Sequence, residues 1–248
     1  MSKKNILFFI LIAFKDIFRP KIVALMLLPF FISALFWGLV TYFSWGFFTS
    51  LGFAFFESSL VQYFLDLMKN FITFDALPFV WITRLFFVGA VIIPLSLISA
   101  LTITSILLVP VIVEEIRQND FPTIIKKSQS LFKGSTTSLS LSAKYFFSWI
   151  GTLPLWIIIP GGSLIIPFLL LSWFNSRLFS WEILIELMTV NEARDFVKIH
   201  STNLWILGLI TSVLYFIPVI NIIAPVITAA SFSRYALAET QKNQSLIK

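Results

Sequence analysis

Two basic residues, Arg19 and Lys21, flank Pro20 immediately before the first long apolar stretch of the chain. A guanidinium and an ammonium group on either side of a proline could form a gate for an anion. The same two side chains could instead anchor the chain to lipid phosphate at a membrane surface. Under the first interpretation Arg19 and Lys21 are candidate substrate-binding residues, and under the second they only fix the topology of the chain.

A second set of candidate anion donors occurs where proline and glycine interrupt apolar sequence. Gly161, Gly162 and Ser163 follow one proline, and Asn221 lies three residues after another. If helices begin at these places, their first backbone amides and positive dipole ends would favour a negative charge. The alternative is that these residues only let the chain reverse its direction.

The composition argues against most other kinds of site. The chain has no cysteine, so it has neither disulfides nor thiolate chemistry, and His200 is its only histidine. Gly-rich phosphate loops, nucleophile elbows and paired-carboxylate motifs are absent from the sequence. The net charge is +6, but the basic segment 126–133 is short and has little aromatic content. We therefore expect no enzyme activity, no metal, no cofactor and no nucleic-acid partner.

The elements that must position the candidate residues are membrane helices. Of the 248 residues, 58% are hydrophobic and 12% are charged, whereas soluble domains carry roughly 25% charged residues. Four stretches contain no Asp, Glu, Lys or Arg, and each exceeds the roughly 20 residues that a spanning helix needs. These stretches are 22–56, 85–113, 145–176 and 199–233. Because the backbone must satisfy its own hydrogen bonds in a bilayer, the sequence predicts an all-α integral membrane protein.

The four stretches predict two kinds of element. The first two contain isolated prolines and predict two long transmembrane helices, over 22–48 and 85–113. The last two are broken in the middle by Pro/Gly or Pro/Asn, into halves that cover only about 20–27 Å. The hydrocarbon core is about 30 Å thick. We therefore expect two hemi-penetrating helical hairpins, over 145–176 and 199–235, with six full crossings as the alternative.

The two broken segments also resemble each other. Residues 158–167 and 216–225 align without a gap, and each contains two prolines seven residues apart. An internal repeat and chance similarity between apolar sequences both explain this alignment.

The distribution of Lys and Arg predicts the orientation. Sixteen of the 18 lie in segments that would share one side of the membrane, and the segment between the first two stretches carries two. By the positive-inside rule both termini are cytoplasmic. The remaining predicted segments are an interfacial helix over 5–18, an external segment over 49–84, cytoplasmic segments over 114–144 and 177–198, and a tail over 236–248.

Polar residues near the second predicted span lead to two further expectations. The hydroxyls of Thr102, Thr104 and Ser105 should bond to the preceding turn or to a neighbouring helix. Glu114 and Glu115 lie at a helix C-terminus, where acidic groups are unfavourable, so each needs a basic partner. We expect Arg117 or a basic residue of 126–144 to supply it.

The chain resembles the CysZ-like sulfate permeases and, more broadly, the etoposide-induced-protein domain family of membrane proteins. The resemblance spans nearly the whole chain, and its clearest block is the last hairpin, Tyr215–Pro225. The other matching pieces are Arg19–Lys21, Leu28–Phe30, Val109–Glu114, Ile159–Gly161 and Asn175–Phe179.

The resemblance implies a helical inner-membrane protein with two long spans and two hemi-penetrating hairpins. In the sulfate-handling members it implies sulfate entry for cysteine synthesis. Those members carry an arginine pair before the first span, whereas this chain has Val23 and Ala24 at the corresponding positions. The fold therefore transfers more readily than the substrate.

Two hypotheses for function follow. The first is a multi-pass anion permease or channel of the bacterial inner membrane, with sulfate for sulfur assimilation as the candidate substrate. Its partners would be the lipid bilayer, a small inorganic anion and further copies of the 28.3 kDa chain in a homo-oligomer. The second is a non-transporting membrane scaffold or envelope protein of the same family, which the missing arginine pair favours.

Overall fold

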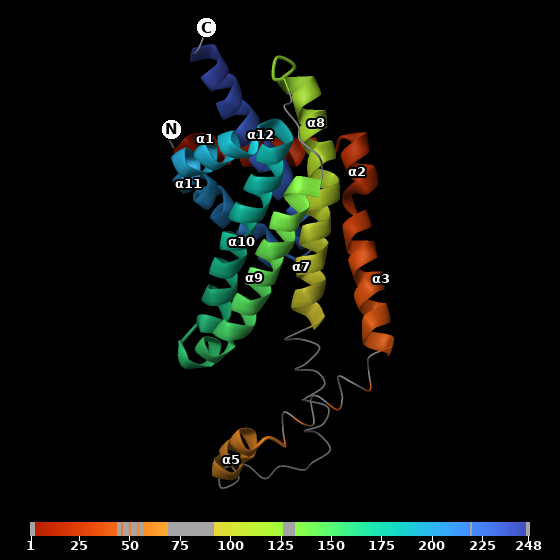
Figure 1. Cartoon of the computed structure of the whole chain (residues 1–248), viewed down its shortest axis with the longest axis vertical. Coiled ribbons are helices and arrows are strands. Elements are labelled where there is room, and N and C mark those ends of the chain that lie inside the picture. The colour runs from red at the N-terminus through yellow and green to blue at the C-terminus, as the bar shows by residue number, and fades with distance from the viewer. Residues whose placement is uncertain are drawn as a thin grey trace. The chain divides into compact units, whose positions relative to one another are not determined.

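The computed structural model describes residues 3–43, 46, 50, 54, 57–68, 92–125, 132–218 and 220–246. Every regular element in these ranges is a helix (Figure 1). The helices are α1 (Lys3–Asp16), α2 (Pro20–Met26), α3 (Leu28–Phe43), α5 (Ser59–Met68), α7 (Ile93–Ile103), the π-helix η2 (Thr104–Leu108), α8 (Val109–Asp120), α9 (Phe132–Ile158), α10 (Gly162–Leu187), α11 (Val190–Val213), the 3-10 helix η3 (Leu214–Phe216) and α12 (Ile220–Leu246).

Five of the described helical segments are long and apolar enough to cross a membrane. They are Pro20–Phe43, Ile93–Asp120, Gly162–Leu187, Val190–Phe216 and Ile220–Gln244. The chain is therefore an all-α, multi-pass membrane protein, as the sequence predicted. Most of the predicted external segment 49–84, the start of the predicted second span at 85–91, and residues 126–131 lie outside the described residues.

Prolines shape both predicted spans. In the first, α2 and α3 are separated at Leu27, two residues before Pro29, whose missing N–H cannot donate to the carbonyl four residues earlier. In the second, η2 joins α7 to α8 just before Pro110. The N–H of Val109 donates to the carbonyl of Thr104, five residues earlier, so the helix widens by one residue where the proline begins a new turn.

The hydroxyls of the second span have partners of the expected kinds. Thr104 donates to the carbonyl of Ala100 at 2.7 Å, and Ser105 donates to the carbonyl of Thr102 at 2.9 Å. The Thr102 hydroxyl lies 2.6 Å from the hydroxyl of Ser142 on α9. This confirms that these side chains satisfy themselves on their own helix or a neighbouring one.

The chain divides into two compact units. Unit 1 comprises Met1–Phe30 and Ser99–Lys248, and unit 2 comprises Phe31–Ile98. Within unit 2, the hydroxyl of Ser33 on α3 donates to the carbonyl of Ser96 on α7 at 2.6 Å. Within unit 1, α10 packs against α9 and α11, and α12 packs against α1 and α8. Fully buried aromatic side chains of α10 and α12, Phe174, Phe179, Phe232 and Tyr235, lie in this core.

Unit 1 contains two helical hairpins, α9–α10 and α11–α12. Their helices have 27, 26, 24 and 27 residues, so they continue well beyond the charge-free halves of the predicted hairpins. The aligned segments also correspond in the structure: α10 begins at Gly162 and α12 at Ile220, which are aligned positions. Pro167 and Pro225 are each the sixth residue of their helix, so the two aligned segments occupy corresponding positions in α10 and α12.

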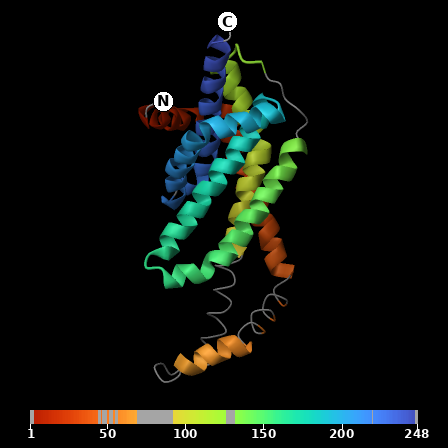
Figure 2. The ribbon, with the colours of Figure 1, turned by 60° about the vertical axis from the view of Figure 1, so that its left-hand side comes forward.

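Helix α1 corresponds to the predicted interfacial helix over 5–18. It lies across the other helices of unit 1 (Figures 1 and 2). One face, containing Ile6, Ile10 and Ala13, is buried, whereas Leu7, Phe8 and Leu11 on other faces are exposed. An apolar helix with one face against protein and another uncovered suits the boundary of a bilayer.

Candidate functional site

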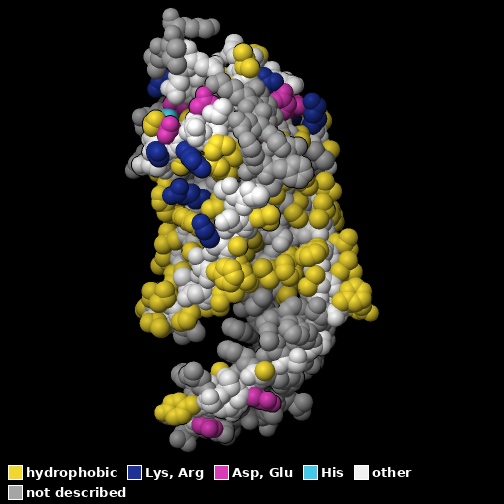
Figure 3. All heavy atoms as spheres, viewed as in Figure 1, with side chains coloured by type: hydrophobic (Ala, Val, Ile, Leu, Met, Phe, Trp, Pro, Cys, Tyr) yellow, Lys and Arg dark blue, Asp and Glu magenta, His cyan; other side chains and the backbone are white. Residues whose placement is uncertain are grey.

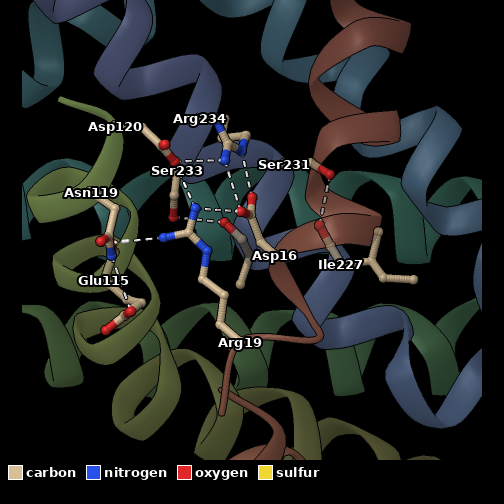
Figure 4. Close-up of polar contacts among 10 residues, drawn as sticks. Asp16, Arg19, Glu115, Asn119, Asp120, Ile227, Ser231, Ser233 and Arg234 are labelled. Atoms are coloured by element: carbon tan, nitrogen blue, oxygen red, sulfur yellow. Dashed lines mark hydrogen bonds and ion pairs between the residues drawn. The ribbon is translucent and has the colours of Figure 1, made fainter. Parts of the chain in front are cut away.

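The largest group of charged side chains in close contact within the described part of unit 1 lies where α1, α2, α8 and α12 meet (Figure 4). At its centre, the Arg234 guanidinium donates from both Nε and NH2 to the two carboxylate oxygens of Asp16, with the NH2–Oδ1 distance at 2.7 Å. The Asp16 side chain is 2% exposed and that of Arg234 is 10% exposed. This bidentate, buried ion pair joins the end of α1 to the middle of α12.

A second arginine extends the pair into a network. Arg19 NH2 lies 2.9 Å from Asp16 Oδ1 and 2.7 Å from Asp120 Oδ2. Arg234 NH2 also reaches Asp120 Oδ2, at 2.8 Å. Each arginine therefore touches both aspartates, and each aspartate touches both arginines. Such alternation lowers the cost of removing these charges from water, because every charge faces opposite neighbours.

The turn before α2 positions Arg19. After α1 ends at Asp16, the N–H of Arg19 donates to the carbonyl of Asp16 at 3.0 Å, and α2 begins at Pro20. Proline suits the first position of a helix because its missing N–H would have no helical partner there. The Arg19 side chain also donates from NH1 to the carbonyl of Glu115 on α8 at 3.1 Å.

Lys21 lies at the edge of this network. Its Nζ atom is 2.9 Å from Glu115 Oε2, and its side chain is 68% exposed. The amide of Asn119 donates to the other Glu115 carboxylate oxygen, at 3.1 Å. The expectation of basic partners for Glu114 and Glu115 is confirmed for one of them: Glu114 pairs with Arg117 at 2.6 Å, as expected, but Glu115 pairs with Lys21 from α2.

We name the six charged residues of this site the ion-pair cluster: Asp16, Arg19, Lys21, Glu115, Asp120 and Arg234. It contains three cations and three carboxylates, so its formal charge is zero. An added anion would have to compete with a carboxylate for a cation that is already paired. The cation best placed for such an exchange is Lys21, because it is the most exposed and has the fewest partners.

The predicted donors at 161–163 lie elsewhere. They form the turn between α9 and α10, at the opposite end of these helices from the ion-pair cluster (Figure 1). Gly161 has a left-handed backbone (φ 75°), which glycine adopts without strain. The N–H of Gly162 donates to the carbonyl of Ile159 at 2.8 Å, so this amide is already bonded. Ser163 is exposed beside it.

Asn221 occupies the equivalent position in the second hairpin, as the second residue of α12. Its N–H donates to the carbonyl of Ile217 at 3.0 Å, and its side chain is exposed. Asn221 and Arg234 are 13 positions apart in the sequence, which corresponds to about 20 Å along α12. The structure therefore brings Arg19 and Lys21 together, and places the residues at the two turns away from them.

Both turn sites have one more feature in common. Pro167 and Pro225 lack the N–H that would bond to the carbonyl four residues earlier. Those carbonyls belong to Ser163 and Asn221. Each turn therefore combines helix-start amides, which attract anions, with an oxygen deprived of its usual donor, which attracts hydrogen-bond donors instead.

Asp16 and Asp120 were not predicted from the sequence to be parts of a site. One signal for them was available in the sequence: an acidic residue beside a long apolar stretch needs a cationic partner if the fold buries it. A smaller polar contact was also missed, in which the hydroxyl of Ser138 on α9 donates to the buried Glu182 carboxylate on α10. Among the described residues, no group of His, Cys, Asp and Glu could hold a metal ion.

Comparison with known families decides the classification. A family described as Sulfate transporter CysZ/Etoposide-induced protein 2.4 matches residues 9–225. The chain belongs to this family. The CysZ/etoposide-induced match includes Arg19, Lys21 and both turns, but Arg234 lies beyond it. No curated protein and no solved structure matches the chain. The resemblance inferred from the sequence is therefore confirmed at the level of the family.

Proposed function

We propose that this CysZ/etoposide-induced family member is an anion permease or channel of the bacterial inner membrane, with sulfate as its substrate. The family match supports this proposal, since the family's description names a sulfate transporter and the match covers most of the chain. The five candidate spans suit a transport protein. In this proposal both termini face the cytoplasm, and copies of the chain form a homo-oligomer whose walls enclose the anion path.

Lys21 is the residue at which an anion first meets the protein in this proposal. Its ammonium group is largely exposed and has one carboxylate partner, Glu115. An oxyanion can take the place of that carboxylate without disturbing the buried Asp16–Arg234 pair. Arg19, two residues before Lys21, is already paired with Asp16 and Asp120, so its role in this proposal is to hold the turn that carries Lys21.

The two turns are the second place for anion contacts. Ser163 and Asn221 have exposed polar side chains beside helix starts. A hydroxyl and an amide can donate to an oxyanion even where the neighbouring backbone N–H is already bonded. Gly161 lets the chain reverse with a left-handed backbone, and Gly162 is buried against α9, so in this proposal Ser163 is the donor that reaches the anion at the first turn.

The test is sulfate flux in proteoliposomes made from purified protein. We expect uptake of labelled sulfate above that of empty liposomes. Lys21→Gln should reduce the uptake several-fold, because it removes the accessible charge while leaving the buried pair intact. The matched control is Lys198→Gln, which removes an exposed lysine that also has one carboxylate partner, Asp195, on α11. Equal loss in both variants would argue against a specific role for Lys21.

One observation favours the second candidate function, a non-transporting membrane scaffold. The ion-pair cluster is formally neutral and each of its cations has a carboxylate partner. A site of this kind holds helices together without any substrate. If several anions, sulfate included, show no flux above empty liposomes, the permease proposal fails and the scaffold becomes the better account.

A further inference from the structure

A groove outside the ion-pair cluster lies among α9, α10 and α11. Its volume is about 240 Å³, which is roughly eight times the ~30 Å³ that one water molecule occupies in the liquid. Three tryptophans, Trp173, Trp181 and Trp205, form much of its wall, with Arg177 and Ser201 at the polar side and Leu204 beneath. None of the residues that line it is acidic.

Arg177 gives the groove its charge. Its side chain is exposed, and no ion pair to it occurs within the part of the chain that the structure describes. Arg19, Arg117 and Arg234 differ, because each of them contacts a carboxylate. A guanidinium between aromatic walls and hydroxyls, with no carboxylate in the lining, suits a phosphate group with its several acceptor oxygens.

The charge pattern around the groove is the one expected where a bilayer changes from hydrocarbon to headgroups. Arg177 directly follows the charge-free stretch that ends at Ser176, and on α9 Lys144 directly precedes its start. In Figure 3, Lys and Arg side chains gather over α11 and the upper half of α10, and the surface towards the α9–α10 turn is hydrophobic. Tryptophan is enriched at this same boundary in membrane proteins.

We propose that this groove binds the headgroup of an anionic phospholipid. Arg177 pairs with the phosphate, the Ser201 hydroxyl can donate to it, and the acyl chains lie along the apolar surface towards the α9–α10 turn. The size supports a headgroup rather than a whole ligand, since pockets that enclose drug-sized molecules are about 300–1,000 Å³. This site does not depend on transport, so it can be tested independently of the permease proposal.

The experiment is calorimetric titration of the purified full-length protein in detergent. The ligands are dihexanoyl phosphatidylglycerol, dihexanoyl phosphatidylcholine and inorganic phosphate. We expect saturable binding of phosphatidylglycerol and much weaker binding of the other two. Arg177→Gln should weaken phosphatidylglycerol binding about tenfold or more, the loss typical of a charge-assisted hydrogen bond. Arg194→Gln removes an exposed arginine of α11 that does not line the groove, and should change the affinity less than about twofold.

A second variant separates lost charge from altered folding. Ser201→Leu keeps Arg177 but fills part of the groove from an exposed position of α11, so it should also weaken binding while circular dichroism stays unchanged. Phosphatidylcholine binding as tight as phosphatidylglycerol would overturn the proposal, because the aromatic walls would then be recognising choline. Binding of inorganic phosphate without any gain from the lipid would overturn it too. Phosphatidylglycerol binding that neither variant weakens would place the lipid elsewhere on the protein.

Discussion

The pair of Asp16 and Arg234 shows how a charged contact can hold a membrane protein together. The two residues are 218 positions apart in the sequence, yet their side chains meet twice and are almost fully buried. Burying two charges is costly, so the net contribution of such a pair is small. Removing one partner is a different matter, because the remaining charge stays buried with its main contact gone.

We therefore expect Asp16→Asn to lower the free energy of unfolding by about 3–5 kcal/mol. Arg234→Gln should destabilise the protein similarly, since it leaves both Asp16 and Asp120 with one fewer cation. The double variant should lose less than the sum of the two, because no charge is left unpaired between α1 and α12. Denaturation of the purified protein in detergent, followed by circular dichroism, measures all three.

The exposed pair of Asp195 and Lys198 is the matched control for this prediction. Its atoms are 3.5 Å apart, and both side chains are well exposed. Asp195→Asn should change the stability by no more than about 1 kcal/mol. Equal effects at the two pairs would mean that burial does not set the strength of the Asp16–Arg234 contact.

At the residue level, the sequence identified the cations better than their partners. Arg19 and Lys21 were singled out because they flank a proline beside an apolar stretch. Two of their partners, Asp120 and Glu115, could not be assigned, since both lie on α8 and approach Arg19 and Lys21 only when α8 packs against α2 and α12. The expectation for Glu115 shows the same limit: a basic partner exists, but it comes from α2 rather than from the residues that follow.

At the level of elements, helix contacts depend on small residues that periodicity alone does not reveal. Gly208 of α11 faces α10 so closely that a Cβ atom would lie 2.8 Å from the carbonyl oxygen of Ser172. Nearby, the amide of Asn175 donates to the Ser212 hydroxyl at 3.0 Å. A small residue at the crossing and a polar contact beside it are typical of helix packing in membranes.

Gly208→Ala should therefore destabilise the protein by about 1–3 kcal/mol, because α10 and α11 must move apart to admit the methyl group. Gly151→Ala is the matched control. Gly151 lies inside α9 with nothing within 4 Å of a Cβ atom, so the change should be neutral or stabilise by up to about 1 kcal/mol. Thermal unfolding of the two purified variants in the same detergent compares them directly. A stability of Gly208→Ala equal to that of Gly151→Ala would contradict the close approach of α10 and α11.

The sequence predicted the breaks between helices more accurately than the helix ends. Pro160 with two glycines, and Pro218 with Asn221, located the two hairpin turns, and the aligned prolines reappear at matching positions of α10 and α12. The outer ends were missed because charged residues were treated as the limits of helices. Alpha-helices tolerate charges once they leave the apolar layer, and α10 continues past Arg177 to Leu187.

For the whole molecule, the charge distribution along the hairpin helices indicates how deep the two hairpin turns enter the membrane. Helix length alone does not. All four helices have 24 to 27 residues, or about 36–40 Å. Their apolar parts, counted from each turn to the first Lys or Arg, are shorter: 145–158, 162–176, 199–213 and 220–233. These 14 or 15 residues cover about 21–22 Å, less than the roughly 30 Å of hydrocarbon.

We therefore expect the turns of both hairpins to stop within the membrane. The chain has no cysteine, so single cysteines can be introduced and treated in intact cells with a thiol reagent that cannot cross membranes. Ser163→Cys and Asn221→Cys occupy exposed positions at the two turns and should stay unlabelled from outside. Gln62→Cys, in the predicted external segment, should label in intact cells, and Asn243→Cys, in the predicted cytoplasmic tail, only after permeabilisation. Rapid labelling at Ser163→Cys and Asn221→Cys in intact cells would instead mean that the hairpins cross completely, and that the charged ends of α9 to α12 lie deeper in the bilayer than their charge favours.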